Sequence, residues 1–223
     1  MLKRDEIVEI LKQAKRVDSR YELFGAKKHK YQLNPPISTS FVRAIEEKYE
    51  FSLPEDYFRF ITEIGDGGAG TDYGIYPFAD LVKKRQERFA ERHYQNYRNS
   101  LKNAFTPRPM LADEFEEFSI LKSDYEQNPE QYFIYQNSDE ERQCHLDGFY
   151  VLGTHGCAWD FGMVITGEMR GKVFTTDNTG AYCLEADSFE EFYQNWLDRI
   201  NAKKLKEELE KRREFWKKIQ PIQ

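Results

Sequence analysis

The sequence predicts an α+β fold, a single domain with a central, mostly antiparallel sheet flanked by helices and a C-terminal helical extension. Amphipathic helical patterns occupy the N-terminal part, strand-like runs gather between residues 148 and 185, and a capped helix followed by a highly charged segment closes the chain. The 223 residues allow one large domain or two small ones, and the aromatic content of 15% can fill a core.

Three helices are expected before the first glycine-rich loop. The first spans residues 4–20, where apolar side chains recur at three- and four-residue spacing with charges between them. The second spans 40–50. The third begins at residues 52–55, whose Ser-Leu-Pro-Glu sequence has the spacing of a capping box, and it ends at the glycines of 65–70, which accept the left-handed conformation of a C-cap.

The rest of the chain contains the expected sheet. Its expected strands are 73–78, 132–136, 148–154, 161–166, 172–176 and 181–185. The run at 148–154 has little polar interruption, which is typical of a strand buried on both faces. The next two strands flank a glycine-bounded loop and predict a hairpin. A basic helix is expected at 79–104 and an acidic, loop-rich segment at 109–147.

The last part of the chain is expected to be helical. Ser188 and Glu191 repeat the capping-box spacing at the start of a helix that ends near residue 200, and a charged helix follows. We therefore expect one domain over residues 1–200, with core motifs at 38–78 and 148–200 and an insertion at 79–147. Residues 201–223 form the charged helical tail.

Charge, hydropathy and cysteine content exclude several classes of protein. No apolar run approaches the roughly 18–20 residues that cross a bilayer, and the N-terminus lacks the apolar region of a signal peptide. The three cysteines are too few for a disulfide scaffold. A net charge of -6 argues against general nucleic-acid binding. We expect a cytoplasmic protein without membrane contact or direct nucleic-acid contact.

Two loops contain residues that could support chemistry. The loop at 65–70 is glycine-rich, but it follows a helix and precedes a strand, unlike a phosphate-binding loop. The loop at 154–160 combines His155, Cys157 and Asp160, and a Cys/His-dependent enzyme remains an alternative. Cys144 and His145 add a second pair of zinc-ligand types, with a spacing that matches no familiar knuckle. We expect a structural turn at 154–160, with no catalytic residue, metal or cofactor.

The charges are segregated along the middle of the chain. Residues 81–108 contain eight basic and two acidic side chains, a net charge of +6, and they are expected to form a solvated helix. Residues 109–147 contain eleven acidic and two basic side chains, a net charge of -9. Such a segment is either a solvated surface or a surface that steers a basic partner.

Four segments, in this order, resemble the SUKH superfamily, which includes the fungal Smi/Knr cell-wall regulators. They are the helix, Leu-Pro and aromatic-rich helix of 45–60, the glycine turn of 65–70, the strand, turn and hairpin of 150–174, and the Ser-Phe-Glu-Glu-Phe of 188–192. The turn at 155–160 departs from the usual Asp-Gly-x-Gly-Asp. The resemblance implies an α+β fold without an active site, a toxin-immunity role in bacterial members and a signalling scaffold in fungal ones.

The leading hypothesis is therefore an immunity protein that binds and neutralises a toxin with a basic surface, such as a nuclease. The alternative is a Smi/Knr-type signalling or regulatory scaffold that uses the C-terminal charged helix. For the first, we predict acidic contacts and two aromatic anchors in the segment 109–147. These residues are Glu114, Glu116, Glu117, Asp139, Glu140 and Glu141, with Tyr132 or Tyr135 as anchor.

Overall fold

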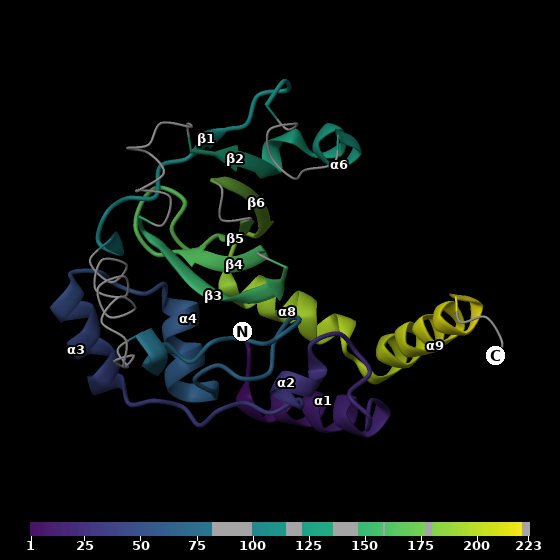
Figure 1. Ribbon diagram of the computed structural model, residues 1–223. Coiled ribbons are helices and arrows are strands. Elements are labelled where there is room, and N and C mark those ends of the chain that lie inside the picture. Colours follow the sequence, from purple (N-terminus) through teal and green to yellow (C-terminus); the bar gives the residue numbers. More distant parts are fainter. Residues whose placement is uncertain (82–99, 115–121, 136–146, 158, 177–179, 220–223) are drawn as a thin grey trace, which may run out of the picture.

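A computed structural model describes residues 1–81, 100–114, 122–135, 147–157, 159–176 and 180–219 (Figure 1). Its centre is a six-stranded sheet of order β1-β2-β6-β5-β4-β3, in which every neighbouring pair is antiparallel. The strands are β1 (Arg108–Pro109), β2 (Tyr132–Ile134), β3 (Phe149–Gly156), β4 (Trp159–Val164), β5 (Val173–Thr176) and β6 (Ala181–Ala186). The predicted α+β fold with a mostly antiparallel sheet is confirmed.

Helices gather at the β3 end of the sheet, whereas β1, β2 and α6 lie at the opposite end (Figure 1). The α-helices are α1 (Arg4–Val17), α2 (Ala26–His29), α3 (Thr39–Tyr49), α4 (Glu55–Arg59), α6 (Lys122–Gln127), α8 (Phe189–Arg199) and α9 (Ala202–Ile219). Shorter turns of other type are η1 (Phe60–Ile64), η2 (Phe78–Leu81) and η4 (Pro129–Gln131). No helix in the described ranges is long and apolar enough to cross a membrane.

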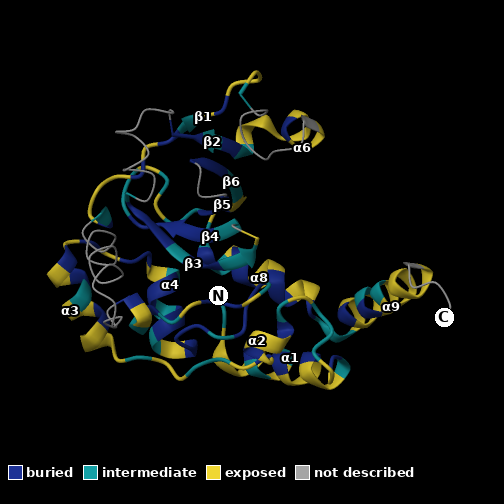
Figure 2. Ribbon diagram, in the orientation of Figure 1, coloured by how far each residue is buried: buried dark blue, intermediate teal, exposed yellow. Residues whose placement is uncertain are grey.

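The sheet is buried on both faces, and β3 shows this most clearly. Tyr150 and Leu152 join the main core with the helices, while Phe149 joins a second cluster with Phe174 and Tyr182. Because successive side chains of a strand point to opposite faces, this alternation means that both faces are covered. The prediction of a doubly buried strand is confirmed. Figure 2 shows buried residues throughout the central strands and on the helix faces that meet them.

Helix α8 anchors the helical layer to the sheet. Its N-cap is the predicted one, since Ser188 Oγ accepts a hydrogen bond from the Glu191 amide at 3.1 Å. The Phe189 ring lies 4.9 Å from the Phe60 ring, between centroids. One turn later, the buried Tyr193 hydroxyl donates to the carbonyl of Ala69 at 2.9 Å, which holds the glycine-rich loop against the helix.

Three helix ends differ from the sequence prediction. Helix α1 ends at Val17 because the carboxylate of Asp18 accepts hydrogen bonds from the amides of Glu22 and Leu23 and so folds the chain into a loop. The capping box at 52–55 is wrong: α4 begins after Pro54, which has no side-chain cap. The helix then continues as the π-helical η1, and Gly65 behind it is extended rather than left-handed.

The segment 73–78 is not a strand. Ile75 makes single bridges to Gly68 and Gly153, and the chain then enters η2, whose first amides donate to the buried carboxylate of Asp66. This segment ties the glycine-rich loop to β3 without extending the sheet. Most of the expected basic helix, residues 82–99, lies outside the described residues.

Helix α9 packs against the body of the protein along its first half. Leu205 and Leu209 are fully or almost fully buried, and Arg213 forms an ion pair with Glu22 at 2.6 Å beyond the end of α1. The last turns project away from the body (Figure 1). There Phe215 and Trp216 are more than half exposed.

Candidate functional site

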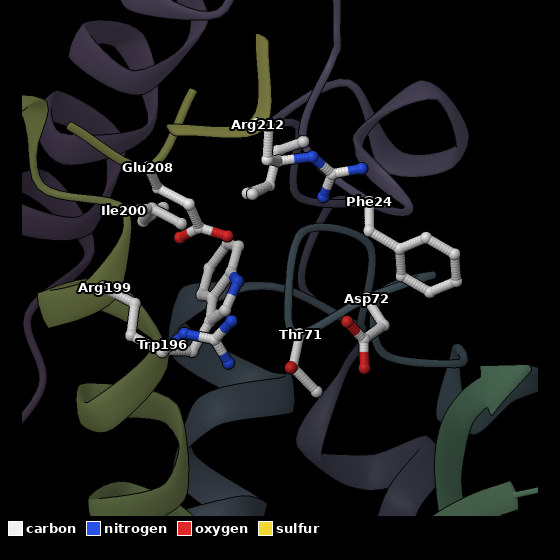
Figure 3. A pocket seen from close by; sticks show the side chains of 9 residues that line it. Phe24, Thr71, Asp72, Trp196, Arg199, Ile200, Glu208 and Arg212 are labelled. Atoms are coloured by element: carbon white, nitrogen blue, oxygen red, sulfur yellow. The ribbon is translucent and has the colours of Figure 1, made fainter. Parts of the chain in front are cut away.

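A small cavity lies where α8 and α9 meet the loop after α1 and the loop after the glycines. Its volume is about 140 Å³, similar to the roughly 150 Å³ that holds a benzene-sized group in an engineered cavity. Figure 3 shows its walls. They include Phe24, Thr71, Asp72, Trp196, Arg199, Glu208 and Arg212. Two cations, two carboxylates and two aromatic rings therefore surround a space that fits one side chain.

The backbone of Asp72 is fixed by its neighbours. Asp72 has a φ of 46°, in the left-handed region, and the Gly25 backbone, with a φ of 76°, packs directly on its carbonyl group. A Cβ at position 25 would lie 1.8 Å from the Asp72 carbonyl oxygen, so only glycine fits here. Gly25 therefore brings the loop after α1 into contact with the loop that follows the glycines.

The side chain of His29 contacts the same loop. Its Nδ1 accepts a hydrogen bond from the Tyr31 amide at 3.0 Å, and the ring also bonds to the backbone of Asp72. The ring meets Trp196 edge-on, with centroids 5.9 Å apart. Burial lowers the pKa of His29 to about 4, so the imidazole is neutral near pH 7.

This buried imidazole predicts an acid-sensitive fold. In the unfolded chain His29 takes up a proton near its ordinary pKa of 6.5, but in the folded protein it does so only near pH 4. The free energy of unfolding therefore decreases as pH falls from 6.5 towards 4, by at most about 3 kcal/mol. Urea unfolding of wild type and His29→Gln at pH 7, 6 and 5 measures this loss, which the variant should not show.

The matched control is Glu22→Gln. The ion pair with Arg213 lowers the pKa of Glu22, so its titration falls below the window from pH 6.5 to 5. The control should keep the wild-type dependence between those pH values. An equal dependence in His29→Gln would show that another group causes it.

A chain of polar contacts runs from Asp72 across the sheet. The Asp72 carboxylate contacts His155 Nδ1. On the other side of the ring, His155 Nε2 lies 3.0 Å from Thr175 Oγ1, and Thr175 Oγ1 lies 2.9 Å from a Glu185 carboxylate oxygen. The chain therefore links the loop after the glycines to strands β3, β5 and β6.

Asp72, His155 and Thr175 contact one another in the same sequence as the acid, base and nucleophile of a hydrolase triad. The hydrogen bond that Thr175 donates favours instead a role in holding the loop of Asp72 against the sheet. Thr175 Oγ1 donates its single hydrogen to a Glu185 carboxylate oxygen, so this hydrogen is directed at the carboxylate rather than at His155 Nε2. Cys157 is exposed in the turn after β3, and no described hydrogen bond joins its thiol to His155. Within the described residues, no three histidine, cysteine or carboxylate side chains gather as metal ligands would.

One exposed aromatic ring, that of Phe24, lines the cavity, and a second, that of Tyr73, packs against it. Phe24 is 45% exposed and Tyr73 is 38% exposed, and they meet edge-on with centroids 5.1 Å apart. The Tyr73 ring also covers Gly156 at the end of β3. We call this region, formed by Phe24, Asp72, Tyr73, His155 and Gly156, the Asp72 surface. Exposed rings beside a side-chain-sized cavity are typical of the energetic centre of protein interfaces.

The predicted contact residues that the structure describes lie near the opposite end of the sheet. Glu114 accepts hydrogen bonds from Arg108 and from the Leu111 amide, and Arg108 lowers its pKa. Tyr132 is buried against Tyr125, and the buried Tyr135 accepts a hydrogen bond from the Thr106 amide. The other predicted residues, Glu116, Glu117, Asp139, Glu140 and Glu141, lie outside the described residues, as do Cys144 and His145.

The sequence interpretation did not identify most of the Asp72 surface. It considered His155 as part of a turn, but it assigned no role to Phe24, Asp72, Tyr73 or Trp196. The available signal was the position of Asp72 directly after a glycine-rich loop and before an aromatic residue. That signal gives no indication that Gly25 and His29, more than forty residues earlier, hold the same loop.

The fold defines the class of protein, an α+β protein with an antiparallel sheet flanked by helices. Residues 36–195 match the model of the SMI1 / KNR4 family (SUKH-1). Because the match covers more than half of the chain, the protein belongs to this family. No curated protein and no solved structure matches the chain.

Some residues of the site lie inside the range that matches the family and others lie outside it. Thr71, Asp72 and His155 lie within residues 36–195, whereas Phe24 lies before them and Trp196, Arg199, Glu208 and Arg212 lie after them. The cavity is therefore built jointly by the part of the chain that matches the family and by helices that flank it.

Proposed function

We propose that this chain is a protein-binding module that acts as an immunity protein, binding a cognate toxin domain and blocking its activity. One observation supports the binding role most directly: the exposed Phe24–Tyr73 pair beside a small cavity lined by charges of both signs. Family membership supports the immunity role, because such binding is what the SUKH resemblance implies for bacterial members. The proposed contact is the Asp72 surface.

The surface suits this role because it is already ordered in the free protein. Gly25, His29 and His155 fix the loop that presents Asp72 and Tyr73. A partner therefore does not have to supply the free energy that ordering a loop would cost. An apolar or aromatic side chain of the partner would enter the cavity, and the surrounding charges would select its neighbours.

The acidic segment 109–147 has a separate role in this proposal. Glu116, Glu117, Asp139, Glu140 and Glu141 remain our prediction for the steering surface, because a toxin that binds nucleic acid has a basic cleft. Steering by exposed charges increases the association rate and is weakened by salt. Glu114 is less suited to this role, since Arg108 already neutralises it.

Removal of both exposed rings is expected to abolish protection. Phe24→Ala/Tyr73→Ala should weaken binding at least 30-fold, about 2 kcal/mol, because hot-spot aromatics dominate interface free energies. The test co-expresses each variant with a toxin domain captured by pull-down with the wild-type chain, then measures cell growth and the dissociation constant of the purified pair. The control is Phe41→Ala on α3, which also removes an exposed ring.

Three outcomes separate the parts of this proposal. Loss in the double variant but not in Phe41→Ala supports the Asp72 surface. If binding and protection are lost only when the acidic residues of 109–147 are replaced by alanine, the toxin contacts that segment instead. Failure of the wild-type chain to bind or protect against the toxin contradicts the immunity role.

A regulatory scaffold is the second candidate function, favoured by the projecting end of α9. Phe215 and Trp216 form an exposed ring pair there, with centroids 5.9 Å apart, beyond the part of the helix that packs on the body. Truncation after Asn201 would not test this role cleanly, because it also removes the buried Leu205 and Leu209. The clean variant is Phe215→Ala/Trp216→Ala, with partner binding as the measurement.

A further inference from the structure

A second groove lies between α1 and the segment 31–33, outside the Asp72 surface. Its volume is about 380 Å³. Three cations, Arg4, Lys12 and Lys15, and three apolar side chains, Val8, Leu11 and Leu33, contribute to its walls, and none of the acidic residues that the structure describes lines it. The groove therefore combines an apolar surface with charge of one sign.

The sequence of α1 explains this separation of charge. At 100° per residue, positions 4, 8, 11, 12 and 15 fall on one face of a helix, and the carboxylates of Glu6 and Glu9 fall elsewhere. The helix thus directs Arg4, Lys12 and Lys15 to the groove and Glu6 and Glu9 away from it, while Asp5 lies at the edge of the groove face, next to Lys12.

The two lysines are available to a partner. Lys12 and Lys15 are exposed and form no ion pair or hydrogen bond with the described residues. Arg4 donates to the backbone carbonyl of Ile64, a neutral group, and forms no ion pair with a carboxylate of the described residues. On the opposite wall, Gln32 is also exposed, whereas the Tyr31 hydroxyl donates to Asp18.

We propose that this groove binds an acidic, amphipathic segment of a protein partner. The apolar floor would receive leucine-sized side chains, and Lys12 and Lys15 would pair with carboxylates on either side of them. A nucleic acid fits less well, because a backbone of phosphates favours many cations and exposed stacking rings, whereas Tyr31 is buried. This site is independent of toxin binding at the Asp72 surface and would allow two partners to be bound at once.

The test uses the full-length free protein and three labelled peptides. The first peptide has leucines at three- and four-residue spacing with glutamates between them; the second replaces glutamate with lysine, and the third replaces leucine with serine. Fluorescence anisotropy should show binding of the first only, weakened at least ten-fold by Lys12→Glu/Lys15→Glu and weakened by salt. Gln32→Glu, from the opposite wall, should also weaken it.

The control is Arg16→Glu/Lys204→Glu, which makes the same charge change at exposed positions that do not line the groove. This control should bind the first peptide within about two-fold of wild type. Equal weakening by both double variants, no binding of the first peptide, or tighter binding of a DNA oligonucleotide at Lys12 and Lys15 would overturn the proposal. Because no toxin is present, these outcomes are distinct from failure of the immunity role.

Discussion

Gly25→Ala is expected to lower the free energy of unfolding by at least about 3 kcal/mol. A left-handed residue with a side chain costs about 1 kcal/mol on its own. The new Cβ would also lie 1.8 Å from the Asp72 carbonyl oxygen, where backbone rather than a flexible side chain must move. Urea unfolding at pH 7 measures the loss.

Gly171→Ala provides the matched control. Gly171 has a φ of 96°, also in the left-handed region, but a Cβ there would have no neighbouring atom within 4 Å. This variant should lose only the conformational part, about 1 kcal/mol. Equal losses at both positions would show that the contact between residues 25 and 72 does not hold the two loops together.

Leu205→Ala/Leu209→Ala is expected to release α9 from the body of the protein. Both side chains are buried, and each leucine-to-alanine change in a core costs about 2–5 kcal/mol. The pair therefore removes a large part of the roughly 5–15 kcal/mol that stabilises a typical domain. The cavity should also open, because Glu208 and Arg212 on α9 form one of its walls. Thermal unfolding and proteolysis of the C-terminal segment measure both effects.

The contrasting variant is Phe215→Ala/Trp216→Ala. These rings lie on the same helix but are more than half exposed, so their removal should change the free energy of unfolding by less than about 0.5 kcal/mol. If the leucine pair proved as neutral as the aromatic pair, α9 would be a detached tail, as a division of the chain after residue 200 suggests.

Sequence patterns correctly predicted the elements that are determined by residues close together in the sequence. The Ser188 cap, the apolar stripe of α8 and the hairpin of β4 and β5 all depend on residues close in sequence. The prediction was wrong at 52–55, where no serine side chain caps the helix, and at 73–78, where single bridges replace a strand. Both segments are shaped by contacts with distant parts of the chain, such as the bridge from Ile75 to Gly153.

The Asp72 surface could not be predicted from the sequence for the same reason. Its parts come from the loop after α1, the loop after the glycines and the end of β3. No periodicity or spacing relates Gly25 to Asp72 or Asp72 to His155, because each contact joins residues more than forty positions apart. The acidic segment, by contrast, was evident from composition alone, yet most of its predicted contact residues lie outside the described residues.

The flanking helices give this family member its own surfaces. Residues 36–195 match the family, but α1 and α9 lie outside that range, and α9 contributes to the cavity whereas α1 contributes to the groove beside residues 31–33. Partner choice would then depend on additions to the shared fold rather than on the sheet itself. If these helices are transferred to another family member, that protein should acquire the binding preference of this chain.

Hydrogen–deuterium exchange of the chain with and without the toxin domain tests the central claim most directly. Backbone amides report protection segment by segment without any mutation. The account predicts that toxin binding slows exchange in residues 22–25, 71–76 and 153–157, the three segments that form the Asp72 surface. Protection confined to other segments, with unchanged exchange in these three, would contradict it.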